Sequence, residues 1–284
     1  LLLVPSPAIW VVGVALSTCA HGRYRGPMPW RGLDFVVTGT GRSGTLYTAR
    51  LFTAAGLPCG HEEYFRYWPA WFERGQRREQ PYAALREPYY RARESARRLR
   101  SPLVGDASWL AVPRLKRFRG AVFLQVRHPL QVVRGFVGNE FFTNPDEHGH
   151  YHGYATQFFG LTGDPVQDAL RWWLDWNQRA ERHADITYRL EDFDEARFAS
   201  LLAHLDVDDA QGTAEAAFAA GPQNVNHAAA NRWQKAQLEW ADIDDTDTKR
   251  AATALAKRYG YDVDTVIDLR SPAPQTEPAQ ATGD

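Results

Sequence analysis

The residues best suited to chemistry in this chain form a glycine-rich loop with a basic side chain inside it. The loop reads Gly39-Thr40-Gly41-Arg42-Ser43-Gly44-Thr45. Glycines permit backbone conformations and close approaches that side chains forbid. The first amides of the helix that we expect after the loop have no partner within that helix. We therefore predict that Gly39, Thr40, Gly41, Arg42, Ser43, Gly44 and Thr45 bind an anion.

The spelling of this loop leaves the kind of anion open. It fits the dinucleotide fingerprint GxGxxG and also the first six positions of the nucleotide P-loop, GxxxxG. An ATPase or GTPase needs a Lys next, to reach the β- and γ-phosphates, and Thr45 holds that place. A triphosphate is therefore disfavoured.

A nicotinamide-dinucleotide-dependent oxidoreductase is an alternative that would use the same glycines. Such a site needs an acid roughly 20 residues further on, at the end of a second strand. Glu62 or Glu63 lies about there. Residues 54–60, which precede these acids, are broken by Pro and Gly and make a poor strand.

A second basic turn follows the clearest buried strand after the first. Residues 121–126 are apolar except for Gln125, and they end in Arg127-His128-Pro129. The planar fork of an Arg side chain suits it to bind phosphate oxygens bidentately.

These two turns together resemble the signatures of sulfotransferases that use 3′-phosphoadenylyl sulfate (PAPS). In that family a Lys or Arg precedes Ser-Gly-Thr in the 5′-phosphosulfate loop, as Arg42 does here. The Arg-x-Pro that follows a later strand, here starting at Arg127, grips the 3′-phosphate. The resemblance covers about residues 33–261. The family usually has a Ser eight residues after that Arg, and this chain has Gly135.

The resemblance implies an in-line transfer of a sulfuryl group from PAPS to a hydroxyl or amine acceptor, without a metal. Arg42 would stabilise charge on the sulfuryl oxygens and the leaving phosphate. Glu62 would take the acceptor's proton, with His61 and Glu63 as alternative bases. Arg232 or Lys235 would cover the 3′-phosphate. The sequence does not say whether the acceptor is a sugar, a lipid or a metabolite.

The elements that must position these residues predict an α/β fold. Apolar strands at 34–38, 103–106, 121–126 and 186–190 alternate with helical segments, including 169–183 and 248–259. We expect a P-loop-type three-layer sandwich, with a central, mostly parallel β-sheet flanked by helices. Ligands bind at the carboxyl edge of such sheets.

Two segments receive structural rather than chemical interpretations. Residues 139–164 have no clear period and are expected to be an inserted loop, whose His148, His150 and His152 belong to a polar surface rather than to a metal site. Glu191 and Asp192 are expected to cap the helix after the last strand.

Length and composition favour one domain. With 284 residues, 44% of them hydrophobic, the chain can bury one substantial core. We expect that domain at 33–270, preceded by an apolar segment and linker at 1–32 and followed by a disordered tail at 271–284. A net charge of −1 gives no global field that would attract nucleic acid.

Two expectations concern the surroundings of the protein. Two cysteines suit a reducing compartment, so we expect a cytoplasmic location. Residues 8–20 are apolar but short for a membrane span, and they are the one segment expected to offer membrane contact or N-terminal anchoring. A non-enzyme alternative is an adaptor that binds an acidic partner through the aromatic and arginine residues of 66–100.

Overall fold

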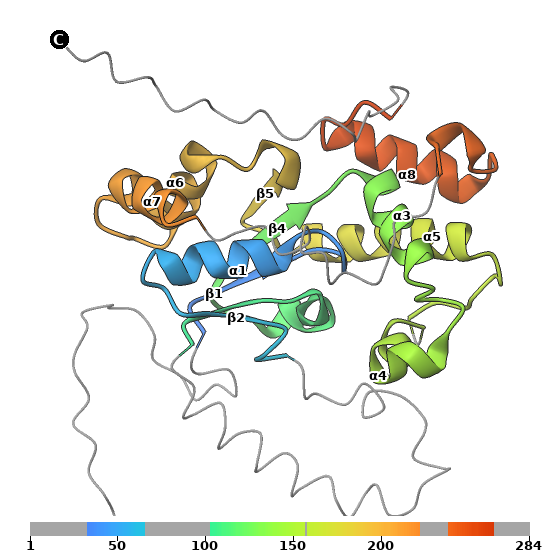
Figure 1. The fold of residues 1–284 in the computed structure, drawn as a ribbon, viewed down its shortest axis with the longest axis horizontal. Helices are drawn as coiled ribbons and strands as arrows, with labels where there is room; N and C mark the ends of the chain where they lie inside the picture. Colours follow the sequence, from blue (N-terminus) through green and yellow to red (C-terminus); the bar gives the residue numbers. More distant parts are fainter. Residues whose placement is uncertain (1–32, 66–102, 157, 222–237, 264–284) are drawn as a thin grey trace, which may run out of the picture.

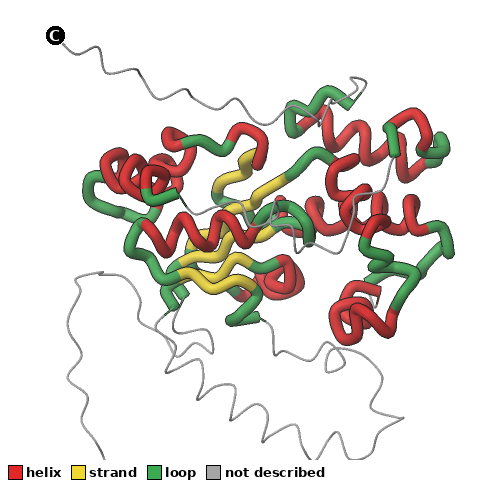
Figure 2. The backbone as a smooth tube through the Cα atoms, in the orientation of Figure 1, coloured by secondary structure: helices red, strands yellow, loops and turns green. Residues whose placement is uncertain are grey.

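The computed structural model describes residues 33–65, 103–156, 158–221 and 238–263. Within them, five strands form one parallel sheet in the order β2-β3-β1-β4-β5 (Figure 2). The strands are β1 Phe35–Thr38, β2 Cys59–His61, β3 Gly105–Ala107, β4 Ala121–Val126 and β5 Ile186–Arg189.

Helices cover both faces of this sheet (Figure 1). One face packs against α1 Thr45–Ala54, α6 Glu195–His204 and α7 Ala210–Ala219. The other packs against η3 Trp109–Arg117, α3 Pro129–Gly138, α5 Pro165–Glu181 and α8 Asp247–Arg258. The predicted α/β fold, a parallel sheet between two helical layers, is confirmed.

The central strand β1 is apolar on both faces because both are covered. Phe35 points to the α1 side, where its ring lies 4.4 Å from that of Phe52. Val36 points to the side of η3 and α5. Gly105 on β3 leaves room for the Phe35 ring, since a Cβ there would lie 2.1 Å from it. This packing fixes β1 between β3 and β4 and sets the position of the loop that leaves it.

Strand β2 overturns the expectation that residues 54–60 make a poor strand. It begins directly after Pro58 and forms the edge of the sheet. Edge strands tolerate a neighbouring Pro, and the carbonyl of Pro58 accepts hydrogen bonds from the N–H groups of Val104 and Gly105. The Pro and Gly therefore mark an edge rather than the absence of a strand.

The expectation of a loop over 139–164 is also wrong in part. Helix α4 spans Pro145–Thr156, and its backbone leaves helical geometry at Gly149 (φ 48°, ψ −124°). The break divides the helix into two short polar pieces, so no apolar periodicity marks it. The His148 ring packs on Phe141, and its Nε2 lies 2.6 Å from the carbonyl oxygen of Asn139.

The remaining helices begin and end as their sequences suggest. Asp164 caps α5 and Thr246 caps α8 with side-chain oxygens, and Gly260 follows α8 with φ +82°. Short helical turns η4 Leu190–Asp192 and η6 Trp240–Asp242 complete the described elements. In this part of the chain we find no helix with the length and apolar character that crossing a bilayer requires. Residues 8–20 lie outside it.

Candidate functional site

The glycine-rich loop lies where β1 gives way to α1, at the carboxyl edge of the sheet. Two of its glycines are required by their surroundings. A Cβ on Gly39 would lie 2.2 Å from the carbonyl oxygen of Gln125 on β4, and Gly44 has φ +90°, in the left-handed region. Gly44 is also the N-cap residue of α1, and no side chain of the described residues caps this helix. The helix start thus faces the loop with its dipole uncompensated.

Gln125 holds this loop from the neighbouring strand. Its side-chain amide donates to the carbonyl of Ser43, 2.5 Å away. Its carbonyl oxygen accepts from the hydroxyls of Thr48 and Tyr188, at 2.5 and 2.7 Å. Gln125 is fully buried. The sequence signal for this contact is a polar residue within the otherwise apolar run 121–126.

Within the loop, two hydroxyls have different surroundings. The hydroxyl of Ser43 donates to the carbonyl of Thr40 at 2.7 Å, so its hydrogen bond lies within the loop. The buried hydroxyl of Thr40 has no hydrogen-bond partner among the residues that the structure describes. A buried polar atom of this kind is costly unless a ligand or water satisfies it.

The two basic turns identified in the sequence meet at this edge. Arg127 follows β4, and its Nη1 donates to the carbonyl oxygen of Arg42 at 2.9 Å. Desolvation lowers the pKa of Arg42, the positive charge of Arg127 lowers it further, and Glu62 raises it. The pKa of Arg127 is also lowered, by burial first, although Glu191 opposes this. Two cations held this closely favour an anion between or beside them.

Gly135 on α3 leaves room for the side chain of Arg42. A Cβ on Gly135 would lie 3.4 Å from Cβ, Cγ and Nε of Arg42, so the Arg42 side chain rests on the surface of α3 at this glycine. Arg42 itself has φ +69°, which is unusual for a residue with a side chain. The position where the resembled family has a Ser is therefore covered by the Arg42 side chain.

The expectation that Glu191 caps the following helix is wrong. Asp194 caps α6, accepting from the N–H of Arg197 at 2.8 Å. Glu191 instead accepts from the N–H of His128 at 2.9 Å and from the hydroxyl of Tyr261 at 2.7 Å. It thereby ties the turn after β4 to the segment after α8.

The predicted bases lie at the end of β2. His61 Nε2 is 3.2 Å from Oγ1 of Thr45, the first residue of α1, and 3.9 Å from Oε1 of Glu62. Burial lowers the pKa of His61 to about 4, with a contribution from Arg50, so the ring is neutral near pH 7. His61 and Glu62 thus lie beside the loop, and Glu63 follows them.

The site also contains a buried acid that the sequence motifs do not indicate. Asp106, on β3, accepts from the N–H of Glu63 at 3.1 Å and is fully buried. The signal was an acid at the end of a short apolar run, residues 103–106. Other predicted residues lie outside the described part of the chain: Arg232 and Lys235, and the arginine-rich segment 66–100.

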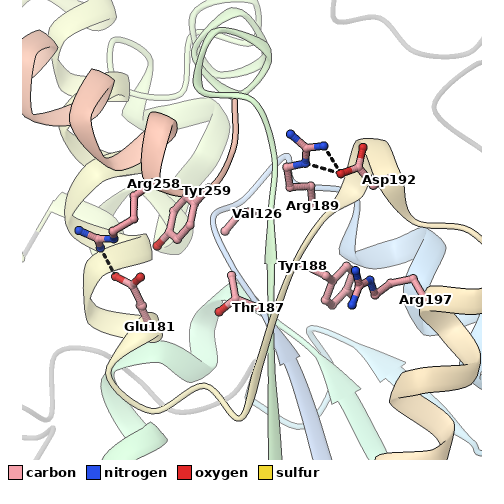
Figure 3. A pocket seen from close by; sticks show the side chains of 9 residues that line it. All are labelled: Val126, Glu181, Thr187, Tyr188, Arg189, Asp192, Arg197, Arg258 and Tyr259. Atoms are coloured by element: carbon pink, nitrogen blue, oxygen red, sulfur yellow. Dashed lines mark hydrogen bonds and ion pairs between the residues drawn. The ribbon is translucent and has the colours of Figure 1, made fainter. Parts of the chain in front are cut away.

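A separate cavity of about 420 Å³ lies beside the edge strand β5 (Figure 3). Among its lining residues, Arg258 pairs with Glu181 and Arg189 pairs with Asp192, as the dashed lines show. Carboxylates therefore balance these two cations, and Arg197 also lines the cavity. The glycine-rich loop and the Arg127 turn lie outside this cavity.

Comparison with known proteins adds a distant likeness. No family model matches this chain, and no curated protein matches it. Among solved structures, the chain is similar to the sulfotransferase domain of the olefin synthase of Synechococcus PCC 7002. The two are 14% identical, with a TM-score of 0.45, and the match covers 84% of this chain and 99% of that one. A likeness this distant carries no argument about function, which must be made from the residues of the site.

Proposed function

We propose that this protein is a sulfotransferase that moves a sulfuryl group from PAPS to a hydroxyl or amine acceptor. The observation that carries the proposal is the contact between two arginine-bearing turns. They are separated by 85 residues in sequence, and Arg127 Nη1 lies 2.9 Å from the Arg42 carbonyl oxygen. Each turn follows the carboxyl end of a strand of the same sheet, and nucleotides bind at that edge in such folds.

The donor set of the loop fits a phosphosulfate better than a triphosphate. The loop offers the helix start at Gly44 and the buried hydroxyl of Thr40, and Thr45 stands where a triphosphate-binding loop needs Lys. Arg127 would grip the 3′-phosphate with its fork. Arg42 would neutralise charge that develops on the sulfuryl oxygens and the leaving phosphate.

The acceptor would enter from the side of β2. In the reaction, the bond between sulfur and the 5′-phosphate oxygen breaks while sulfur bonds to the acceptor oxygen or nitrogen, and adenosine 3′,5′-bisphosphate leaves. Glu62 would take the acceptor's proton. The Nε2 of His61 lies 3.2 Å from Oγ1 of Thr45 on the donor side. We therefore assign His61 to the loop and Glu62 to the acceptor as its base.

Strand order weighs against the nicotinamide alternative. In dinucleotide-binding folds, the acid that binds the ribose follows the strand next to β1. Here β3 separates β2 from β1, so Glu62 and Glu63 lie at the end of a strand two places away. A calorimetric titration with PAPS and with NAD separates the two functions directly.

The test of the proposal is transfer itself. The full chain is incubated with PAPS labelled in its sulfuryl group and a fractionated cell extract, and the fractions are examined for label. We expect label in an acceptor fraction with the wild-type protein and none with Arg42→Ala. Binding of NAD with no binding of PAPS would refute the proposal.

A further inference from the structure

Resting on the proposed function, we propose that Asp106 is a positioning residue for the acceptor side of the site. Through backbone hydrogen bonds it holds the turn that follows His61 and bears Glu62. Asp106 touches none of the groups assigned to the reaction. It acts through the turn that immediately follows β2.

The contacts of Asp106 converge on that turn. Its Oδ1 accepts from the N–H of Glu63 at 3.1 Å, and its Oδ2 accepts from the N–H of Phe65 at 3.4 Å. The side chain is fully buried. A buried carboxylate needs such partners, and both of its oxygens find them on one short stretch of backbone.

The turn needs an external support. Glu62 has φ +54°, in the left-handed region that a residue with a side chain adopts at a cost. Its N–H donates to the carbonyl of Ala107 at 3.1 Å, at the end of β3. With the contacts of Asp106, β3 therefore holds three points of this backbone: Glu62, Glu63 and Phe65.

The neighbouring strand makes room for this arrangement. Gly60 on β2 pairs with Asp106 across the sheet, and a Cβ on Gly60 would lie 2.7 Å from Oδ1 of Asp106. Any side chain at Gly60 would displace the carboxylate or the strand. The position of the Asp106 carboxylate therefore requires a glycine at position 60.

The end of β2 and the turn after it interact with the donor loop at two residues. His61 Nε2 lies 3.2 Å from Oγ1 of Thr45, and the charge of Glu62 raises the pKa of Arg42. A shift of the turn would move both groups relative to the loop. Small displacements of a reacting group cost large factors in rate.

The ionisation of Asp106 gives this arrangement a pH dependence. Burial raises the pKa of Asp106 to about 7, the charge of Glu62 raises it too, and N–H groups of residues 63–65 oppose the change. Above pH 7 the ionised carboxylate accepts at both oxygens, whereas below it the protonated oxygen is a donor facing an N–H group. Among the described residues, the other ionisable groups on the adjoining elements are Cys59, His61, Glu63, Tyr64 and, on η3, the buried Arg114 and the exposed Lys116 and Arg117; β1 contributes none.

The first experiment compares Asp106→Asn with Asp185→Asn. Asp185 also binds a backbone N–H, that of Val122 at 2.7 Å, but at the amino end of the sheet. In Asp106→Asn one of the two N–H groups meets an NH₂ group and loses its acceptor. We expect turnover of PAPS to fall roughly 10- to 100-fold with the dissociation constant for adenosine 3′,5′-bisphosphate unchanged. Asp185→Asn should keep wild-type turnover.

The pH profile is the readout that a general loss of structure would not give. Wild-type turnover should rise as pH increases from 6 to 8, and this rise should be absent in Asp106→Asn. His61, with a pKa of about 4, does not titrate in this range. Stability should show the opposite sign. Because the folded protein holds a proton on Asp106 that the unfolded chain releases at lower pH, wild type should lose stability relative to Asp106→Asn between about pH 4 and 7.

Hydrogen exchange separates failure of this inference from failure of the proposed function. Protection of the amides of Glu63 and Phe65, corrected for intrinsic rates, should rise through pH 7 in the wild-type protein, whether or not it binds PAPS. If Asp106→Asn does not fold, Gly60→Ala should show the same loss of turnover and of protection. Unchanged turnover in the folded variant, or protection that does not vary with pH in wild type, would overturn the inference.

Discussion

Two buried polar side chains hold the two halves of the candidate site, and they differ in one chemical respect. Gln125 on β4 holds the glycine-rich loop, and Asp106 on β3 holds the turn after β2. Both strands flank β1, and both side chains are fully buried. Gln125 is neutral at every pH, whereas Asp106 titrates near pH 7. The donor side should therefore keep its shape across the physiological range, and the acceptor side should not.

The largest effect is expected for Glu62→Gln, on the acceptor side. Loss of the base should lower turnover of PAPS roughly 1,000-fold, since general bases contribute factors of this order. Binding of adenosine 3′,5′-bisphosphate should not weaken, because Glu62 lies outside the donor loop and its negative charge near Arg42 opposes an anion. Steady-state kinetics and calorimetry measure the two quantities. Equal turnover in the variant would remove Glu62 from the mechanism.

Gln125→Leu tests the neutral half of the comparison. It leaves the carbonyl of Ser43 and the hydroxyls of Thr48 and Tyr188 without their partner, which should lower the free energy of unfolding by about 3 kcal/mol. Urea unfolding gives the value.

Gln125→Glu sharpens the same point, because it places an ionisable group on the donor side. When the buried carboxyl ionises, it no longer has an O–H group that can donate to the Ser43 carbonyl, so affinity for adenosine 3′,5′-bisphosphate should fall with rising pH. An affinity without pH dependence in this variant would contradict the role of Gln125.

Arg127→Ala should weaken binding of adenosine 3′,5′-bisphosphate roughly 100-fold, because the 3′-phosphate loses its contact with a charged guanidinium group. Adenosine 5′-phosphosulfate, which lacks the 3′-phosphate, should bind nearly as before. The matched control is Arg258→Ala, whose guanidinium pairs with Glu181 beside β5. Equal losses for both ligands would show that Arg127 does not read the 3′-phosphate.

Gly135 offers a graded test of how Arg42 is placed. Gly135→Ala puts a Cβ in ordinary contact with the Arg42 side chain at 3.4 Å, and it should be tolerated. The branched side chain of Gly135→Val would push Arg42 away, so affinity for PAPS should fall roughly tenfold, as when a partly exposed charged contact is lost. Calorimetry on both variants checks this, and similar affinities would mean that Arg42 does not bind the donor.

The smallest effect is expected for Glu191→Gln. The amide oxygen can still accept from the N–H of His128 or from Tyr261, so stability should fall by about 1 kcal/mol in thermal unfolding. Tyr261→Phe removes only one of these contacts and should cost less. A larger loss in Tyr261→Phe would place the main support of the Arg127 turn elsewhere.

Local pattern was enough to predict the main elements of the fold. The strand at 121–126 agrees with β4 to the residue, and the helix at 248–259 corresponds to α8. The first segment is a short apolar run, which is typical of a buried strand, and the second has the 3.6-residue periodicity of an amphipathic helix. Helix α4 carries no such signal because Gly149 divides it, and β2 is hidden by Pro58 and Gly60.

The motif residues of the candidate site were predictable from the sequence, whereas the residues that support them were not. The loop and Arg127 follow from short motifs, and the structure brings Arg42, Arg127, His61 and Glu62 to one edge of the sheet. Gln125, Asp106 and Glu191 act across strands on partners 41 to 82 residues away. Contacts at that separation depend on strand order, which local sequence does not specify. The domain boundaries at 33 and 270 stay predictions.

The most direct test of the account is the affinity of the wild-type protein for two nucleotides that differ only in the 3′-phosphate. Calorimetric titrations with adenosine 3′,5′-bisphosphate and with adenosine 5′-monophosphate isolate the contribution of the 3′-phosphate, which we assign to Arg127. We expect the bisphosphate to bind roughly 100-fold more tightly, as for a phosphate held by a charged fork. Equal affinities, or no binding of either nucleotide, would contradict the claim that these two turns form a PAPS site.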